Sequence, residues 1–162
     1  MLNAISLLKD DHQRISGLFD LFARSERLNE KLTLFQQIKE ELELHSFVEE
    51  KVFYPALSKF YELSDIIDTC YDEHDEMSDL VDEIDQMEPE SDELAVGDPD
   101  RYPEKYPEKY SDAVEELYLI FQRHVKEEES EVFRGARDLL NPEQLEDLAS
   151  EMNQLRGLGQ VA

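Results

Sequence analysis

Four stretches of this chain carry apolar residues at helical spacing, and one histidine interrupts each of these apolar stripes. Residues three and four apart lie on the same face of an α-helix, so each stripe predicts a helix with one buried face. The chain holds four histidines in all, and the stripes carry one each: His12, His45, His74 and His124. If the buried face takes up about three-sevenths of a helix, chance would place all four histidines there about 3% of the time. The pattern therefore predicts four helices that bring their histidines together in a common core.

Two glutamates lie on the same stripes. Glu49 follows His45 by four residues and Glu128 follows His124 by four residues, so each glutamate shares a helix face with its histidine. Burying a carboxylate costs on the order of several kcal/mol unless a positive group meets it, and no stripe carries a lysine or arginine. Divalent metal ions would compensate both carboxylates and bind neutral imidazole nitrogens. The alternative is a metal-free helical bundle with hydrogen-bonded core histidines.

Four imidazoles and two carboxylates form a mixed set of nitrogen and oxygen ligands. Such a set suits iron, with zinc and manganese as the competing metals. Two glutamates can each bridge a pair of metals, while four histidines provide two terminal ligands per metal. The candidate metal ligands are His12, His45, Glu49, His74, His124 and Glu128. The sequence therefore predicts a carboxylate-bridged centre with two iron ions.

Capping signals and a proline set the limits of the first two predicted helices. Asn3 is a candidate N-cap for a first helix that ends near Arg24, and residues 25–29 form a polar turn before the second helix. Pro55 lacks an amide hydrogen and is expected to end or kink the second helix one turn past the glutamate. Beyond the glutamate, the buried stripe is expected to continue through Val52 and Ala56.

The third and fourth helices are marked in the same way. The third is expected to open after the Ser64-Asp65 cap and to run to Met87. The fourth is expected to start near Ser111-Asp112, where Asp112 and Glu115 have the spacing of a capping box, and to end near residue 140. Residues 88–110 between them form a long predicted loop with Gly97, several prolines and a tandem Tyr-Pro-Glu-Lys repeat.

A fifth, short helix is predicted at about 142–156. Asn141 is its candidate N-cap, Pro142 takes the first helical position, and Gly157 is expected at the C-terminal cap. It carries no histidine and is expected to cover one end or side of the bundle. No segment shows the alternation of a strand, so residues 1–162 are predicted to form one all-α domain: an antiparallel up-down four-helix bundle at about 3–140 with a short C-terminal fifth helix.

Composition excludes several kinds of partner. The 16 basic and 41 acidic residues give a formal net charge of −25, so nucleic acid and anionic membrane surfaces would be repelled. No export signal and no membrane span are evident, and the expected compartment is the cytoplasm. The single cysteine, Cys70, excludes an internal disulfide and is expected to be a small core residue.

The spacing of the candidate ligands separates two classes of metal site in helical bundles. Ferritin-type carboxylate sites use Glu-x-x-His, and no glutamate stands three residues before any histidine of this chain, so that class is excluded. The chain instead carries His-x-x-x-Glu twice, with single histidines on the other two helices. This arrangement resembles the hemerythrin-like family, the HHE cation-binding domains, over about residues 5–135. The most specific segments are His-x-x-x-Glu-Glu with Phe-Tyr-Pro, at 45–55, and His-x-Lys-Glu-Glu-Glu with Val-Phe, at 124–133.

The resemblance implies a role for each ligand. His12 and His45 would be terminal ligands of one iron, His74 and His124 would be terminal ligands of the other, and Glu49 and Glu128 would bridge the two. In oxygen-carrying members the last carboxylate stands five residues after its histidine, which here is Glu129. Helix geometry favours Glu128, because the residue at i+4 stays on the stripe and the residue at i+5 rotates off it.

This chain also departs from the pattern of the oxygen carriers. They have a further histidine one turn after the third-helix histidine, and here that position is Ser78. The position after the second-helix histidine, a glutamate in some relatives, is Ser46. The resemblance therefore implies a centre with open coordination positions. Tyr71 and Tyr118 lie near the stripes and are expected to be packing aromatics.

These features favour a metal- and ligand-binding protein over an enzyme. The preferred hypothesis is a cytoplasmic di-iron protein that binds oxygen, nitric oxide or peroxide for sensing, storage or detoxification. The alternatives are a di-iron enzyme that consumes peroxide or nitric oxide, and an interaction module whose stability responds to iron. Sensing would require a protein partner, which the sequence does not identify.

Overall fold

A computed structural model describes residues 2–87 and 106–161, and every regular element in these two ranges is helical. Five long helices account for most of the chain: α1 (Ala4–Arg24), α2 (Leu28–Val48), α4 (Ser64–Gln86), α6 (Tyr106–Glu127) and α8 (Pro142–Val161). Two π-helical turns follow α2 and α6 without a break: η1 (Glu49–Phe53) and η3 (Glu128–Val132). They continue into the short helices α3 (Tyr54–Leu57) and α7 (Phe133–Leu139), and a 3-10 turn, η2 (Tyr61–Leu63), precedes α4. This confirms the predicted all-α class.

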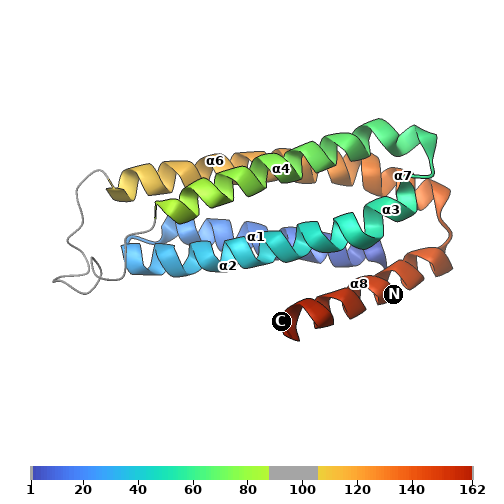
Figure 1. Ribbon diagram of the computed structural model, residues 1–162, viewed down its shortest axis with the longest axis horizontal. Coiled ribbons are helices and arrows are strands. Elements are labelled where there is room, and N and C mark those ends of the chain that lie inside the picture. Colours follow the sequence, from blue (N-terminus) through green and yellow to red (C-terminus); the bar gives the residue numbers. More distant parts are fainter. Residues whose placement is uncertain (1, 88–105, 162) are drawn as a thin grey trace.

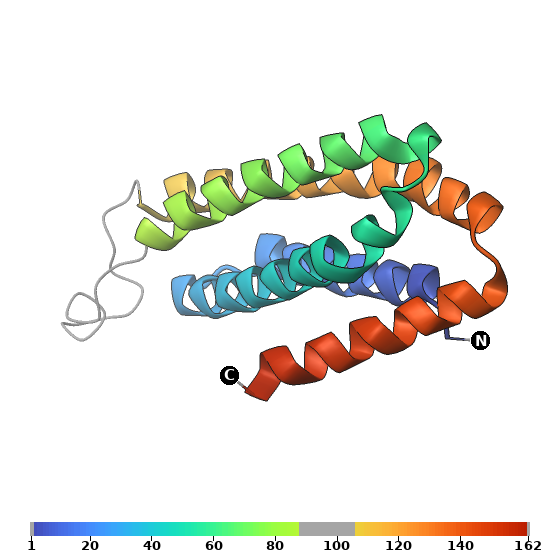
Figure 2. The same ribbon diagram turned by 45° about the vertical axis from the view of Figure 1, so that its right-hand side comes forward.

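The four histidine-bearing helices form an up-down bundle, as Figure 1 shows. Helix α1 contacts α2 and α6, and α4 contacts α6 and α2, so the four helices close a ring around one core. Helix α8 runs back along the outside of the bundle (Figure 2), where it contacts α1, α2 and η1. The fifth helix was expected to cover one end or one side of the bundle, and it covers a side. No helix in the described ranges is both long and apolar enough to cross a membrane.

Two helix starts follow from side-chain capping. The Asn3 side chain accepts a hydrogen bond from the Ser6 amide at 2.9 Å, and the Ser6 hydroxyl accepts one from the Asn3 amide at 3.1 Å. The Asn141 side chain likewise accepts from the Gln144 amide at 2.8 Å, and the Gln144 side chain accepts from the Asn141 amide at 2.9 Å. Each reciprocal pair satisfies amides that a helix N-terminus leaves free, a stabilisation of about 1 kcal/mol. Both predicted N-caps are confirmed.

Other predicted boundaries are wrong. Helix α6 begins at Tyr106, so Asp112 and Glu115 lie inside it and form no capping box. A helix can begin so close to Pro107 because amides in the first turn need no partner within the helix. Helix α8 passes through Gly157 and ends at Val161. Of the predicted loop, residues 88–105, with Gly97, lie outside the described residues.

The buried stripe of the second helix shifts at η1. Val52 and Ala56, expected to be buried, are only half-buried, whereas Phe53, Tyr54 and Leu57 are fully buried. In a π-turn the backbone hydrogen bond runs from residue i+5 to residue i, here from the Tyr54 amide to the Glu49 carbonyl, so one extra residue enters the turn. The face that points into the core therefore moves along by one position. The α-helical spacing of the sequence cannot anticipate that shift.

Two apolar clusters lie above and below the centre of the bundle. One cluster includes residues of α8. The other lies toward the opposite end of the bundle and includes the buried phenylalanines and tyrosines of α1 and α6. Representative fully buried members are Phe53, Phe133 and Leu57 in the first cluster and Phe35, Phe121 and Ile38 in the second. The polar residues between these clusters are therefore cut off from water along the bundle axis.

Candidate metal centre

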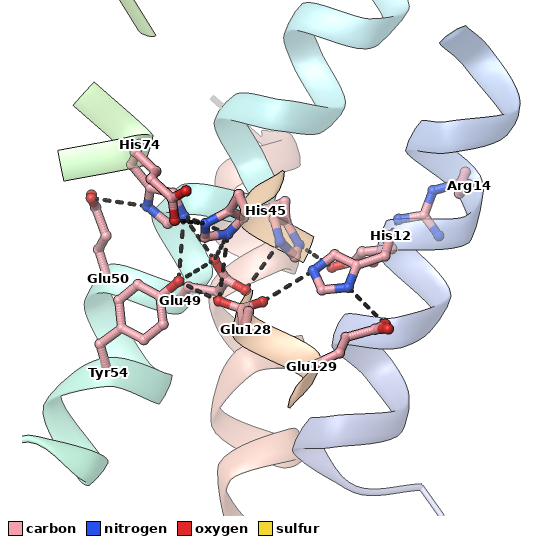
Figure 3. A network of polar contacts seen from close by, with 12 residues as sticks. His12, Arg14, His45, Glu49, Glu50, Tyr54, His74, Glu128 and Glu129 are labelled. Atoms are coloured by element: carbon pink, nitrogen blue, oxygen red, sulfur yellow. Dashed lines mark hydrogen bonds and ion pairs between the residues drawn. The ribbon is translucent and has the colours of Figure 1, made fainter. Parts of the chain in front are cut away.

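All six predicted ligands meet between the two apolar clusters. Figure 3 labels His12, His45, Glu49, His74 and Glu128, which point toward one another. The six come from four different helices and from the first residue of each π-turn, and none is more than 5% exposed. Three groups of closely spaced ligand atoms include them. Two of these match the predicted division: one joins His12 and His45 to both glutamates, and the other joins His74 and His124 to Glu49.

The first half-site contains buried polar atoms that make no hydrogen bonds within the described ranges. It is built from His12, His45, Glu49 and Glu128. His12 Nε2 lies 3.1 Å from Glu128 Oε1, and His45 Nε2 lies 3.0 Å from Glu49 Oε1. These four atoms are buried, and none makes a hydrogen bond in the described parts of the chain. Buried polar atoms are nearly always hydrogen-bonded, so four together are unusual. A cation shared by the four side chains would satisfy them.

The second half-site is formed by His74 and His124. His74 Nε2 lies 3.0 Å from Glu49 Oε2 and 3.3 Å from His124 Nε2. His124 Nε2 in turn lies 3.5 Å from Glu128 Oε2. Each glutamate therefore presents one oxygen to each half-site, which is the arrangement that bridging carboxylates require.

Tyr54 is the site residue that the sequence interpretation missed. Its hydroxyl lies 3.0 Å from Glu49 Oε2 and 3.4 Å from His74 Nε2, and it also contacts Glu128 Oε2. A phenol has one proton, so it can donate to only one of the two carboxylates at a time. Burial and the charges of Glu128 and Glu49 raise the pKa of this phenol well above its usual value. The phenol oxygen thus lies against the carboxylates and His74 of the second half-site.

A signal for Tyr54 was present in the Phe-Tyr-Pro that follows the first His-x-x-x-Glu. Tyr54 stands five residues after Glu49, a spacing that lies off the stripe of an α-helix but on the inner face of a π-turn. The two tyrosines considered from the sequence instead pack as expected. Tyr71 lies with its ring 5.2 Å from that of Tyr54, and Tyr118 stacks on Phe19 at 4.5 Å.

A second layer of carboxylates holds the outer nitrogen of every histidine. Asp11 lies 3.0 Å from His45 Nδ1, Glu50 lies 3.2 Å from His74 Nδ1, Glu73 lies 3.2 Å from His124 Nδ1, and Glu129 lies 3.1 Å from His12 Nδ1. An ionised carboxylate only accepts, so each Nδ1 carries the proton, and Nε2 is left to face the glutamates of the centre. Asp11, Glu50 and Glu73 were also missed, although each stands next to a predicted ligand in the sequence, and Glu129 was considered only as an alternative bridging ligand.

This layer also decides where the two candidate carboxylates of the fourth helix lie. Glu128 is fully buried and faces the half-sites, as helix geometry favours. The Glu129 side chain is 37% exposed and lies on the outer side of His12. The structure therefore places Glu128, at i+4, among the candidate ligands and Glu129 behind His12.

Two members of the second layer are held by arginines. Asp11 Oδ1 accepts from Arg14 Nη2 at 2.7 Å and from Arg156 Nη1 at 2.9 Å, and its other oxygen also contacts Arg156. Burial alone would raise the pKa of Asp11, but hydrogen bonds from His45 and Arg156 outweigh it and hold that pKa far below its usual value. Glu73 Oε2 accepts from Arg123 Nε at 3.1 Å.

Without a metal, protons on the histidines have to balance the negative charge of the buried glutamates. Burial alone would lower the pKa of His45, but the charge of Glu49, the hydrogen bond to Asp11 and the charge of Glu128 raise it to about 10. The pKa of His124 is raised well above its usual value for similar reasons, and the pKa of Glu49 is lowered. An imidazolium whose Nε2–H faces a carboxylate is the protonic equivalent of an imidazole bound to a cation.

Cys70 is buried, as expected, and lies beside the centre. Its thiol falls in a group with His124 and Glu128 whose ligand atoms lie within 4.8 Å of one another. Burial raises the pKa of this thiol. The residue therefore remains a neutral core thiol in the metal-free protein.

A cavity of about 220 Å³ lies between α2 and α4 and reaches one candidate ligand of the centre, His74. Both serines that depart from the oxygen-carrier pattern, Ser46 and Ser78, line it. Ser46 is half-buried, and Ser78 is exposed, because the buried stripe of α4 runs through Met77 instead. The open side that the sequence implied is thus a solvent-connected cavity next to His74.

Comparison with known proteins agrees with this geometry. The sequence profile of the hemerythrin HHE cation binding domain matches residues 3–136, a range that contains all six candidate ligands. The chain belongs to the hemerythrin HHE cation-binding domain family. Helix α8, with Arg156, lies beyond the matched range of this HHE domain.

Two individual proteins are similar to this HHE domain. The crystal structure of a hemerythrin HHE cation binding domain-containing protein from Mycobacterium kansasii has the same fold, with a TM-score of 0.75 and 24% identity over 99% of this chain and 91% of that one. A DNA nickase of Nostoc sp. is 30% identical over 150 residues, which are 93% of this chain. The chain spans 38% of the length of that nickase.

Proposed function

We propose that this HHE domain holds two iron ions and binds a small ligand, namely oxygen, nitric oxide or peroxide, for sensing, storage or detoxification in the cytoplasm. The observation that supports the proposal is the sharing of both buried carboxylates by two pairs of histidines, with four ligand atoms left without hydrogen bonds. Buried polar atoms are nearly always hydrogen-bonded, so these four atoms favour a shared cation. An iron pair, when bound, supplies reversible electron transfer and positions for an exchangeable ligand.

The residues of the chain prepare the centre in three ways. Glu49 and Glu128 supply negative charge that offsets that of two cations. The outer carboxylates fix the tautomer of each histidine, which orients Nε2 inward and raises its basicity. The two apolar clusters exclude water along the bundle axis, so small ligands must enter between helices.

The ligand set favours iron over its competitors. Mixed imidazole and carboxylate donors suit iron, whereas structural zinc sites are four-coordinate and closed, and manganese prefers oxygen donors. Six side chains with two shared carboxylates offer each metal two histidines and two carboxylate oxygens. A di-iron enzyme that consumes peroxide or nitric oxide, or an iron-responsive interaction module, remains the alternative use of the same centre.

Nucleic acid is not part of the proposal, although one relative is named a DNA nickase. The chain carries a formal charge of −25, and a surface of that sign repels phosphate backbones. The matched part of the relative is also a minority of its length. The partners that we propose are therefore a small ligand and, for any sensing role, a protein that recognises the ligand-bound state.

Metal analysis after anaerobic iron loading tests the proposal. We expect about two iron atoms per chain, because the six ligands divide into two half-sites. Iron-loaded protein is then assayed for consumption of peroxide and nitric oxide, which separates the enzyme from the binding protein. Loss of helicity on removal of iron would favour the interaction module. One iron per chain, or preferential zinc binding when iron is abundant, would contradict the proposal.

A matched pair of variants tests the bridging role. Glu128→Ala is expected to lower the content of both metals, because Glu128 presents an oxygen to each half-site. Glu129→Ala is expected to retain both metals with an affinity weakened by about 10- to 100-fold, because Glu129 only orients His12. The reverse order of the two effects would show that Glu129 is the ligand.

A further inference from the structure

We infer that the cavity between α2 and α4 is the route by which small molecules reach the centre, and that its carboxylates admit uncharged molecules and exclude anions. This inference rests on the proposed function and specifies its ligand class. It assigns dioxygen, nitric oxide and undissociated hydrogen peroxide to the centre. It disfavours superoxide, nitrite and azide.

The cavity reaches the centre at a single candidate ligand. Among the six candidate ligands, His74 alone lines it, and Glu50, which holds His74 Nδ1 at 3.2 Å, lines it too. The other five ligands are at most 3% exposed, whereas His74 is 5% exposed. A molecule that enters this cavity therefore meets the centre at its second half-site.

The size of the cavity limits what can enter. Its volume of about 220 Å³ accommodates a molecule of a few heavy atoms together with water. The hydroxyls of Ser46 and Ser78 can donate hydrogen bonds to such a molecule, and apolar side chains form part of the wall. The apolar lining residues are Leu42, Phe47, Met77 and Val81.

The charge of the lining sets the selectivity. Three carboxylates line the cavity, those of Glu43, Glu50 and Asp75, and no lysine or arginine is among the lining residues. Lys51 is not a lining residue, but its Nζ lies 6.0 Å from the centroid of the Phe47 ring, so one cation stands beside a lining that carries three carboxylates. Like charges focused in a cleft with low-dielectric walls lower the local concentration of anions, and this effect weakens with salt. An uncharged molecule does not experience this barrier.

A thiol probe placed in the cavity tests the selectivity without any metal. Ser46→Cys puts a reactive thiol on the lining, and its alkylation is followed with iodoacetamide, which is uncharged, and iodoacetate, which is an anion of similar size. We expect the ratio of the two rates to exceed that of a free cysteine derivative about tenfold at low ionic strength and to approach it at high salt. Cys70, which is buried, is monitored in the natural protein as the background.

Paired charge variants identify the responsible residues. Glu43→Gln with Asp75→Asn, added to Ser46→Cys, is expected to reduce that ratio severalfold. The control is Glu40→Gln with Asp72→Asn, which removes the same charge from exposed positions of α2 and α4 outside the lining. We expect less than a twofold change in the control. Equal ratios for the cavity thiol and free cysteine, or equal effects of the two charge pairs, would overturn the inference.

The route is tested on the iron-loaded protein by stopped flow. Association of nitric oxide and of azide is measured in the natural protein and in Ser78→Phe, where a large side chain at an exposed lining position narrows the cavity. We expect Ser78→Phe to slow both ligands about tenfold, and Glu43→Gln with Asp75→Asn to speed azide alone. Normal iron content with unchanged association rates in both variants would overturn the route while leaving the proposed function intact. Failure to bind iron would instead contradict the proposed function, and the thiol probe would still decide the selectivity.

Discussion

The hydroxyl of Tyr54 lies between the two buried carboxylates of the centre, and its contacts show how a single residue can link both half-sites. It reaches Glu49 Oε2, Glu128 Oε2 and His74 Nε2. All of these groups are buried, so loss of the hydroxyl would leave their polar atoms without access to water. The π-turn at Glu49 makes the contact possible, because it brings a residue at i+5 onto the inner face.

Tyr54→Phe is therefore expected to destabilise the metal-free protein by about 1–3 kcal/mol, because it removes the only proton that a tyrosine offers to two buried carboxylates. Urea unfolding of the metal-free protein followed by circular dichroism measures the change. Tyr71→Phe is the control, since Tyr71 packs against Tyr54 but is only half-buried, and a change below about 0.5 kcal/mol is expected. Equal stability of Tyr54→Phe and the natural protein would show that the hydroxyl contacts contribute nothing.

At the scale of elements, helix α8 adds a contact to the centre from outside the matched HHE range. Arg156 forms a two-pronged contact with Asp11, 145 residues away in the sequence, and Asp11 holds His45 Nδ1. The Arg156 side chain is 16% exposed, so its ion pair is shielded from solvent more than that of Arg14, which is 47% exposed. The last helix thus helps to orient a candidate ligand on α2 through a residue of α1.

Arg156→Met is expected to weaken metal affinity by about 10- to 100-fold, because Asp11 would lose a fixed partner and His45 its orientation. Competition with a chelator of known affinity measures the effect. Arg14→Met, which removes the more exposed partner of Asp11, is expected to cost less, and Arg156→Lys is expected to restore part of the affinity. If Arg156→Met and the natural protein bind metal equally well, α8 only covers the bundle.

For the whole molecule, the buried centre couples metal binding to protons. The metal-free fold is stabilised by a charged His45 whose pKa is raised from its usual 6.5 to about 10. That stabilisation is fully present below pH 6.5 and is lost as the pH rises through about 10. A metal ion binds only the neutral imidazole, so it has to displace the proton across this window.

Metal affinity is accordingly expected to rise with pH between about 6.5 and 10, by up to about tenfold per pH unit for each proton released. Titration calorimetry with a divalent metal in buffers of different ionisation enthalpy counts these protons. We expect at least one proton to be released per chain at pH 7.5, since His45 is charged there. Binding heats that do not depend on the buffer would show that the histidines are already neutral in the metal-free protein.

The sequence by itself determined the helices, two of their caps and the six residues that converge. Apolar stripes, the caps Asn3 and Asn141 and the two His-x-x-x-Glu pairs are local patterns, because an α-helix repeats every 3.6 residues and its N-terminal amides are satisfied by near neighbours. Whether those six side chains bind iron stays a prediction. The start of α6 and the end of α8 were missed. Pro107 lies in the first turn of α6, where amides need no partner within the helix, and a single glycine such as Gly157 costs a helix only about 1 kcal/mol.

Only the tertiary structure decided what surrounds the six residues. The π-turn at Glu49 shifted the buried face by one position and brought Tyr54 inward, a change of register that α-helical periodicity does not encode. The outer carboxylates each hold a histidine of another segment, and Arg156 reaches Asp11 from the far end of the chain. These contacts depend on which helices lie side by side, and packing of the whole bundle decides that. In the sequence, a charged residue next to a candidate ligand looks like any other charged residue on a solvent-exposed face.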